Sequence, residues 1–66
     1  MFRVYINPRA ERVLVTSLKI RDKGWALVST HSTWDKAYRK AIYLANRLDY
    51  ILEWFLEEQI IEVYKN

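Results

Sequence analysis

The fold depends on the C-terminal half of the chain, where residues 33–66 read TWDKAYRKAIYLANRLDYILEWFLEEQIIEVYKN. This half holds neither Gly nor Pro, and its residues can be arranged into two stripes at the alternating three- and four-residue spacing of a helix face. The first stripe is Trp34, Tyr38, Ala41, Ala45, Leu48, Leu52 and Phe55. The second is Lys36, Lys40, Tyr43, Arg47, Tyr50, Trp54, Glu57 and Ile61.

A single long helix is the first prediction from this pattern. Ser32 would be its N-cap, and the carboxylate of Asp35 three residues later would complete a start resembling a capping box. A helix continuing to Val63 would be roughly 45 Å long at about 1.5 Å per residue. A strand of about six to nine residues spans only about 20–30 Å. The helix must therefore either extend beyond its sheet or break.

Two alternatives to the single helix remain open. The favoured position for a break is 46–49, since Asp49 could cap a second helix. Residues 59–64 could instead form a final strand, because Ile60, Ile61 and Val63 suit one.

The N-terminal half predicts β-strands. Phe2, Val4 and Ile6 alternate with Arg3 and Tyr5, which gives a strand with one apolar face. The Asn-Pro pair at 7–8 then stops this strand, because Pro cannot donate to a sheet ladder. β-branched residues dominate 12–20, which predicts a second strand. Its shared face would be Leu14, Thr16, Leu18 and Ile20.

A turn over residues 21–24 separates the second strand from a third at 25–30. Gly24 is the only Gly of the chain, and its place in this turn predicts a positive φ. These elements predict an α+β fold in a single domain, residues 1–66. It would be a three-stranded antiparallel sheet followed by one long C-terminal helix, with a break near 46–49 as the alternative. The predicted core is Phe2, Val4, Ile6, Leu14, Leu18, Val28, Trp34, Tyr38, Ala41, Ala45, Leu48, Leu52 and Phe55.

The second helix stripe is the strongest indication of function. A helix on one small sheet buries only one face, and exposed Tyr and Trp in a row are typical of a protein interface. A 66-residue chain without Cys is also marginally stable alone, while 52% of its residues are apolar. These features predict a small non-enzymatic protein-interaction module that forms a homodimer through the C-terminal helix, with another protein partner as a further possibility. Its interface would be Tyr43, Tyr50, Trp54 and Ile61, unless a broken helix folds back and buries them.

Charge is distributed unevenly along the chain. Residues 1–48 carry ten Lys and Arg against three acids, whereas residues 49–66 carry one Lys against five acids. This asymmetry fits head-to-tail pairing of two chains, or an anionic partner for the basic part. The alternative function is therefore nucleic-acid binding, in which basic side chains contact phosphates and aromatic side chains stack on bases. The candidates are Arg12, Lys19, Arg21, Lys23, Trp25, Lys36 and Lys40.

No catalytic, cofactor or metal site is predicted. His31 is the only His, and Ser29 and Ser32 lie close to it in sequence. Nucleophilic catalysis also needs an orienting acid and an oxyanion hole, and the sequence assigns neither. No signal peptide and no stretch of membrane-spanning length is recognisable, so a cytoplasmic protein without membrane association is expected.

Residues 24–45 resemble two families. The segment begins with Gly24-Trp25-Ala26-Leu27-Val28 and continues through Ser32-Thr33-Trp34-Asp35 to Ala37, Ala41 and Ala45. It is similar to the DUF2188 type of short uncharacterised bacterial proteins, in which a Gly-Trp strand precedes an alanine-rich helix led by Phe or Trp. It also looks like the AP2 and integrase-arm type of DNA-binding domain, in which three antiparallel strands precede a helix. The second resemblance implies that the sheet reads DNA, with Arg12, Lys19, Arg21 and Trp25 at suitable strand positions.

Overall fold

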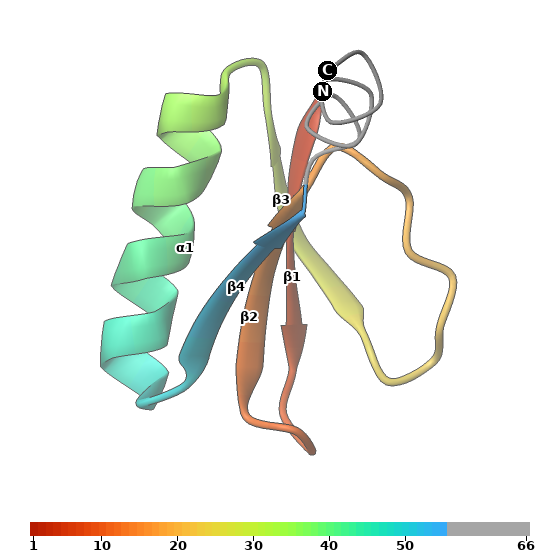
Figure 1. The fold of residues 1–66 in the computed structure, drawn as a ribbon, viewed down its shortest axis with the longest axis vertical. Helices are drawn as coiled ribbons and strands as arrows, with labels where there is room; N and C mark the ends of the chain where they lie inside the picture. Colours follow the sequence, from red (N-terminus) through yellow and green to blue (C-terminus); the bar gives the residue numbers. More distant parts are fainter. Residues whose placement is uncertain (56–66) are drawn as a thin grey trace, which may run out of the picture.

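The protein has an α+β fold in which one helix covers one face of a four-stranded sheet (Figure 1). The structure, a computed structural model, describes residues 1–55. The strands lie in the order β3-β1-β2-β4 across the sheet. The elements are β1 (Phe2–Asn7), β2 (Arg12–Thr16), β3 (Ala26–His31), α1 (Trp34–Leu48) and β4 (Ile51–Phe55).

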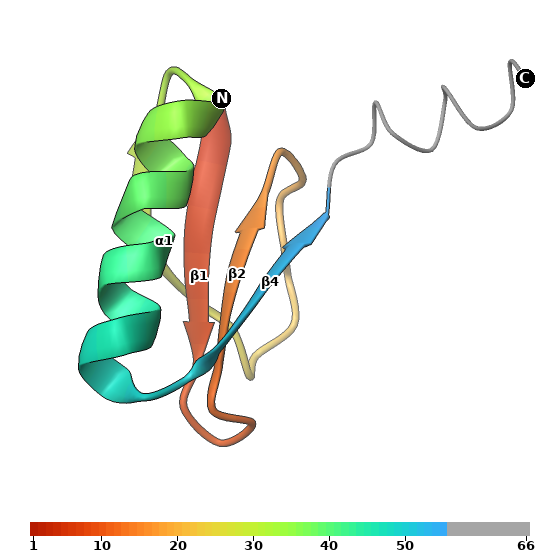
Figure 2. The same cartoon turned by 60° about the vertical axis from the view of Figure 1, so that its left-hand side comes forward.

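The α+β class is confirmed, but the prediction of three antiparallel strands is wrong. β1 pairs antiparallel with both β2 and β3 and so lies between them, and β4 is a fourth strand that runs parallel to β2. Parallel strands need a long connection, and α1 provides it. It carries the chain from β3 at one edge of the sheet to β4 at the other, and Figure 2 shows the arrows of β2 and β4 side by side and pointing the same way.

The helix ends at the position where the alternative prediction placed a break. The prediction of a single long helix is therefore wrong. Asp49 adopts the left-handed conformation, with φ 58° and ψ 42°, and its N–H donates to the carbonyl oxygen of Ala45. The N–H of Tyr50 donates to the same oxygen at 2.9 Å. The predicted second helix after Asp49 is also wrong, because β4 follows. The alternative strand at 59–64 lies outside the described residues.

The helix begins one residue later than predicted. Thr33, not Ser32, is the N-cap, and its Oγ1 accepts from the N–H of Lys36 at 3.3 Å. Asp35 is therefore not the third helical residue that a capping box requires. Its carboxylate instead pairs with Arg39 at 3.1 Å, one helical turn further on.

Three small residues of α1 make the contact between helix and sheet. Ala37, Ala41 and Ala45 are buried at four-residue spacing against a core of Val4, Val13 and Val15. Because Ala has a short side chain, the helix backbone can lie close to the strands. Leu48 falls on the same stripe but is exposed, since it lies in the last turn of the helix. The residues that pack around this core are Phe2, Ile6, Trp34, Leu44, Tyr50 and Leu52.

The helix-covered face of β2 is the opposite of the one predicted, although Thr16 of the predicted face is also fully buried. Val4 pairs with Val15 and Ile6 with Val13, so these Val residues share the helix-covered face of β1. Side chains alternate along a strand, and Leu14 consequently points to the far face. Leu18 lies beyond the end of β2, Val28 is exposed at an irregularity of β3, and Phe55 is exposed on β4. The core predictions at Leu14, Leu18, Val28, Leu48 and Phe55 are therefore wrong.

The second strand is shorter than predicted because residues 17–25 leave the sheet and cross its far face (Figure 1). Tyr5, on that face, is only 3% exposed, and its hydroxyl oxygen accepts from the N–H of Ile20 at 3.0 Å. Arg3 donates to the carbonyl oxygen of Ser17 at 3.0 Å. The loop thus forms a second layer over the sheet, opposite the helix.

The turn residues also differ from the prediction. Gly24 has no positive φ, and its N–H instead donates to the side chain of Asp22 at 2.7 Å, which makes an Asx turn. The positive φ values belong to Glu11 (56°) and Asp49 (58°). Glu11 closes the loop between β1 and β2, where its N–H donates to the carbonyl oxygen of Pro8 at 3.3 Å.

Candidate functional site

The two outer strands of the sheet differ in how well they are protected against pairing with another chain. An outer strand presents unpaired N–H and C=O groups, and proteins commonly protect it with bulges, Lys or Pro. On β3, the register shifts between Val4 and Tyr5, which pair with Ser29 and Leu27 and leave Val28 between them. β4 pairs with β2 regularly over five residues and contains neither Lys nor Pro. We call residues 50–55 the β4 edge; it lacks all three devices.

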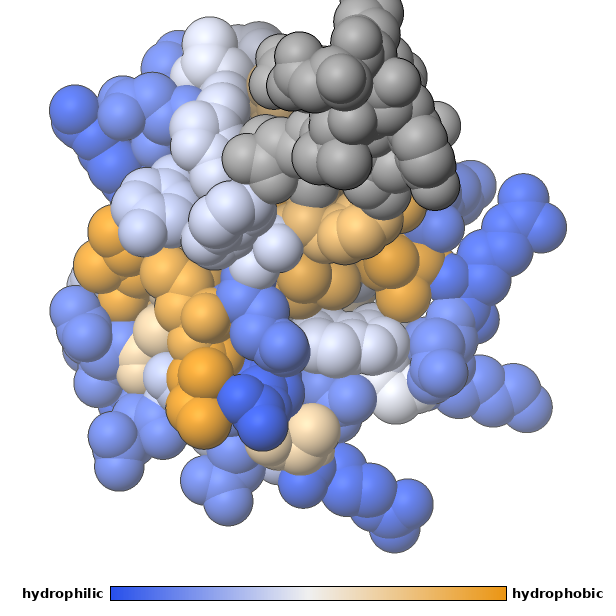
Figure 3. Space-filling model, viewed as in Figure 1, coloured by the Kyte–Doolittle hydropathy of each residue, from blue (hydrophilic) through white to orange (hydrophobic). Residues whose placement is uncertain are grey.

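Large apolar side chains are exposed along the β4 edge. Ile51 is 57% exposed, Trp54 50% and Phe55 42%. Leu52 and Trp54 pair with Val13 and Val15 and so lie on the helix-covered side, whereas Ile51 and Phe55 lie on the far side. Figure 3 shows apolar surface on the side of the molecule that carries β4, with hydrophilic residues around it. Both sides of this strand therefore offer apolar surface.

An aromatic cluster holds Trp54 in place. The ring of Trp34 packs edge-on against Trp54 with centroids 6.4 Å apart, and edge-on against Phe2 at 5.9 Å. Tyr38 stacks on Trp34 at 5.6 Å. Trp54 is thus fixed on one side while half of its surface stays accessible. Rigid, partly exposed Trp side chains are typical anchors of protein interfaces.

The backbone of β4 presents its free groups at alternate residues. The N–H of Ile51 donates to the carbonyl oxygen of Glu11 at 3.0 Å, next to the paired residues Arg12 and Ile51. In a parallel ladder, every second residue directs both its N–H and its C=O to the same neighbour. Ile51 therefore faces β2 with its polar groups, while those of Leu52 and Trp54 point away from the sheet.

One charged residue lies in the β4 strand. Glu53 is paired with Arg12 of β2 at 4.0 Å, and both side chains are partly exposed, 51% and 37%. An exposed ion pair of this length contributes little to stability. The ion pair matters instead for the charge of the strand, because it places the only carboxylate of β4 next to a cation of the same chain.

The structure divides the predicted interface residues between two surfaces. Tyr43 lies on the outward side of α1, 54% exposed, with the Nζ of Lys40 5.7 Å from its ring centroid. Tyr50 and Trp54 belong to the β4 edge, and Ile61 lies outside the described residues. The prediction that these residues form one stripe on a helix is therefore wrong, because the helix ends before Asp49. Ile51 and Phe55 were missed, although β-branched and aromatic residues following Asn46 and Asp49 favour a strand.

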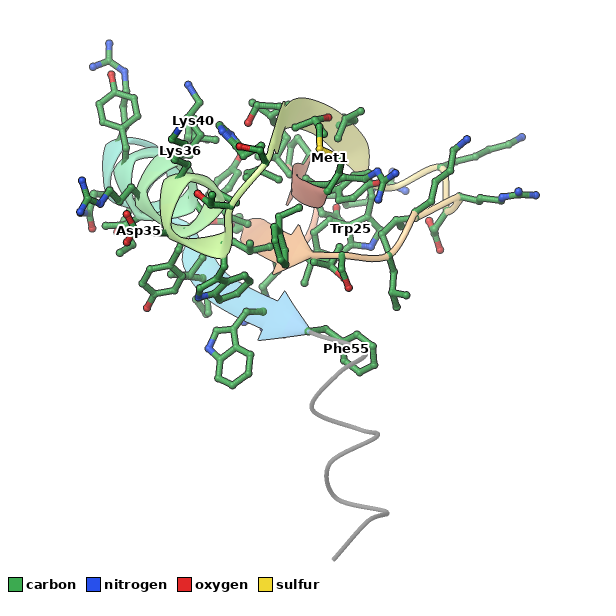
Figure 4. The ribbon with its side chains drawn as sticks, turned by 90° about the horizontal axis from the view of Figure 1, so that it is seen from above. Met1, Trp25, Asp35, Lys36, Lys40 and Phe55 are labelled. Atoms are coloured by element: carbon green, nitrogen blue, oxygen red, sulfur yellow. The ribbon has the colours of Figure 1, made fainter. Side chains whose placement is uncertain are left out.

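The predicted nucleic-acid residues also lie on separate surfaces. Lys19, Arg21, Lys23 and Trp25 belong to the loop on the far side of the sheet. Lys36 and Lys40 lie on α1, across the sheet from Trp25 (Figure 4). Arg12 is next to Glu53. The far face, which the resemblance to DNA-binding domains implied as the reading surface, is covered in part by the loop itself.

His31 has a hydrogen-bonding partner of the kind that catalysis uses. Its Nε2 lies 2.8 Å from the Oγ of Ser29, because residues two apart on β3 share a side of the strand. Nucleophilic catalysis needs a third group that orients the His. Within residues 1–55, no carboxylate is hydrogen-bonded to His31, and no group of three His, Cys, Asp or Glu residues could hold a metal ion.

Comparisons with known proteins leave the function to be argued from this geometry. Neither the protein-family models, nor the curated proteins, nor the solved structures contain a match to the chain. The two family resemblances of residues 24–45 therefore stay predictions. In the part of the chain that the structure describes, no helix is both long and apolar enough to span a membrane.

Proposed function

We propose that this protein is a small non-enzymatic protein-interaction module that forms a homodimer through its β4 edge. One observation carries the proposal: an outer strand without a bulge, Lys or Pro exposes Ile51, Trp54 and Phe55. Exposed apolar side chains beside unpaired backbone groups favour pairing with another polypeptide. Two of the predicted interface residues, Tyr50 and Trp54, belong to this proposed interface. A strand presents them, in place of the predicted helix.

The size of the domain supports the same proposal. Among the described residues, those that are fully buried and large are Val4, Val13, Val15 and Thr16. The other buried core residues include three Ala, which bury little apolar surface each. A domain of this size gains only a few kcal/mol from its own core. Covering half-exposed Trp and Ile side chains in a dimer would add to that stability.

Removing the aromatic groups of the β4 edge should dissociate the dimer. We expect sedimentation velocity to show a dimer of the unchanged protein at micromolar concentration. The double substitution Tyr50→Ala with Trp54→Ala should weaken association at least about tenfold, because anchor residues of interfaces each contribute roughly 2 kcal/mol or more. The substitution Ile51→Glu should do the same without removing a core contact, since a charged side chain on an outer strand opposes edge pairing.

The matched control for these variants is Tyr43→Ala, which removes an equally exposed aromatic side chain from the outward side of α1. It should leave the sedimentation coefficient unchanged. Circular dichroism would show that each variant stays folded. A monomeric unchanged protein at tens of micromolar would contradict the proposal.

Nucleic-acid binding is the second candidate, and the loop over the far face favours it. Lys19, Arg21 and Lys23 are exposed there, close in sequence to the partly buried Trp25. Such an arrangement can contact phosphates and stack on a base. We expect any binding to single-stranded or duplex DNA to fall steeply with salt, and replacing the three basic residues by Ala to reduce the salt dependence. Lys36→Ala with Lys40→Ala is the control on the other side of the sheet. No retention on DNA at low salt would refute this candidate.

A further inference from the structure

We infer that the homodimer forms by antiparallel pairing of the two β4 strands, with Leu52 facing Leu52 of the second copy on a two-fold axis. This inference rests on the proposed function and specifies its partner and geometry. The two four-stranded sheets would join into one continuous sheet of eight strands. Both α1 helices would lie on the same face of that sheet, because a two-fold axis at a strand edge and normal to the sheet preserves the covered side.

The free backbone groups restrict the register of such a pairing. Those of Leu52 and Trp54 point away from β2, as argued from the bond between Ile51 and Glu11. An antiparallel ladder must use these groups, so its hydrogen-bonded pairs combine even-numbered residues only. Two registers then pair five residues of the described chain. One is centred on Leu52 and pairs residues 50–54, and the other is centred on Glu53 and pairs residues 51–55. Centring on Trp54 would pair only residues 53–55 within the described part.

Charge separates the two five-residue registers. Centring on Glu53 would place two carboxylates directly opposite each other in a non-hydrogen-bonded pair, where Cα atoms are about 4.5 Å apart. Like charges in that position oppose pairing. Centring on Leu52 places Glu53 opposite Ile51 of the second copy, and each Glu53 keeps Arg12 of its own chain at 4.0 Å. The same register sets Tyr50 opposite Trp54, an aromatic cross-strand pair that stabilises sheets. In that pair Tyr50 contributes only its C=O to the ladder, because its N–H donates to the carbonyl oxygen of Ala45.

Pairing of β4 with β4 of a second copy also suits the two outer strands better than pairing of β4 with β3 of a second copy would. Head-to-tail pairing of β3 with β4 would leave a free edge on every added copy and build an open filament. The irregularity at Val28 would also interrupt a regular hydrogen-bonded ladder along β3. Pairing of β4 with β4 is self-complementary, and it closes after two copies because each β4 is then covered.

Single cysteine variants test the register directly, because the chain contains no Cys of its own. Ile51 and Glu53 are both exposed, so Ile51→Cys and Glu53→Cys should fold. The two full-length variants are mixed, one carrying an N-terminal extension that changes its size on a gel, and the mixture is oxidised. Opposite residues in a non-hydrogen-bonded pair lie within disulfide range. We expect the mixed cross-link to dominate over both cross-links of a variant with itself.

Each outcome decides between specific alternatives. A cross-link between Ile51→Cys and Phe55→Cys, in which both copies keep Glu53, would establish the register centred on Glu53 and overturn the inference. A dimer in sedimentation without any cross-link at these positions would leave the proposed dimer standing and overturn the register centred on Leu52. A monomer in sedimentation would overturn both. Tyr43→Cys, exposed on the outward side of α1, is the control and should cross-link with neither variant.

Discussion

Replacing Trp34 by Ala should lower the free energy of unfolding by about 3 kcal/mol or more, the range observed when a packed Trp or Phe is truncated. Trp34 lies in the first turn of α1 and touches three other aromatic rings, those of Phe2, Tyr38 and Trp54. It therefore joins β1, the helix and β4. A domain of this length has a total stability of roughly 3–10 kcal/mol. The substitution should consequently remove about a third or more of the total stability.

Urea denaturation followed by far-ultraviolet circular dichroism measures this effect. All proteins must be compared at one concentration, because dimerisation adds to the apparent stability. Tyr43→Ala is the matched control: it removes an aromatic side chain from the same helix, but from the outward side, and should cost less than about 0.5 kcal/mol. A loss below about 1 kcal/mol for Trp34→Ala would show that the aromatic cluster does not hold the three elements together.

Replacing Ala41 by Leu should destabilise the protein by about 1–3 kcal/mol, although Leu is nearly as good a helix former as Ala. Ala41 is fully buried in the middle of the Ala37–Ala45 stripe against Val4, Val13 and Val15. Three added carbon atoms have no space there unless the helix moves away from the sheet. That movement would in turn separate the contacts of Ala37 and Ala45.

The control for Ala41→Leu is Asn46→Leu, which introduces the same side chain at an exposed position of the same helix. It should leave stability unchanged or raise it slightly, since Leu has the higher helix propensity. Both variants are compared by urea denaturation, as above. Equal stabilities of the two would mean that the helix does not lie closely against the sheet.

Local sequence signals predicted much of the fold. The alternation of Phe2, Val4 and Ile6 identified β1 and its buried face, and Pro8 and the Asn before it marked the end of that strand. The alanine spacing identified α1, and the polar residues Asn46 and Asp49 marked the position where it ends, but only as an alternative to one long helix. These features could be read because each depends on neighbouring residues: side-chain alternation, capping and left-handed termination all act within a few positions.

The candidate site was predicted only in part, because residues 50–55 fit two periodicities. Tyr50 and Trp54 are four residues apart, which places them on one face of a helix and equally on one side of a strand. Leu52 lies on the first helical stripe and also between them on the strand. The left-handed Asp49 and the bond from Ile51 to Glu11 decide for the strand. That bond joins residues 40 positions apart, so no local pattern could reveal it.

The sequence by itself thus determined that a strand-rich N-terminal half is followed by an alanine-striped helix, and that aromatic residues lie near the end of that helix. Only the tertiary structure decided which surface presents them. Val13 and Val15 face the helix because β1 sets their register, and β4 lies at the outer edge because β2 offers it a partner. Strand pairing joins residues distant in sequence, and a shift by one residue exchanges the buried and exposed sides of a strand.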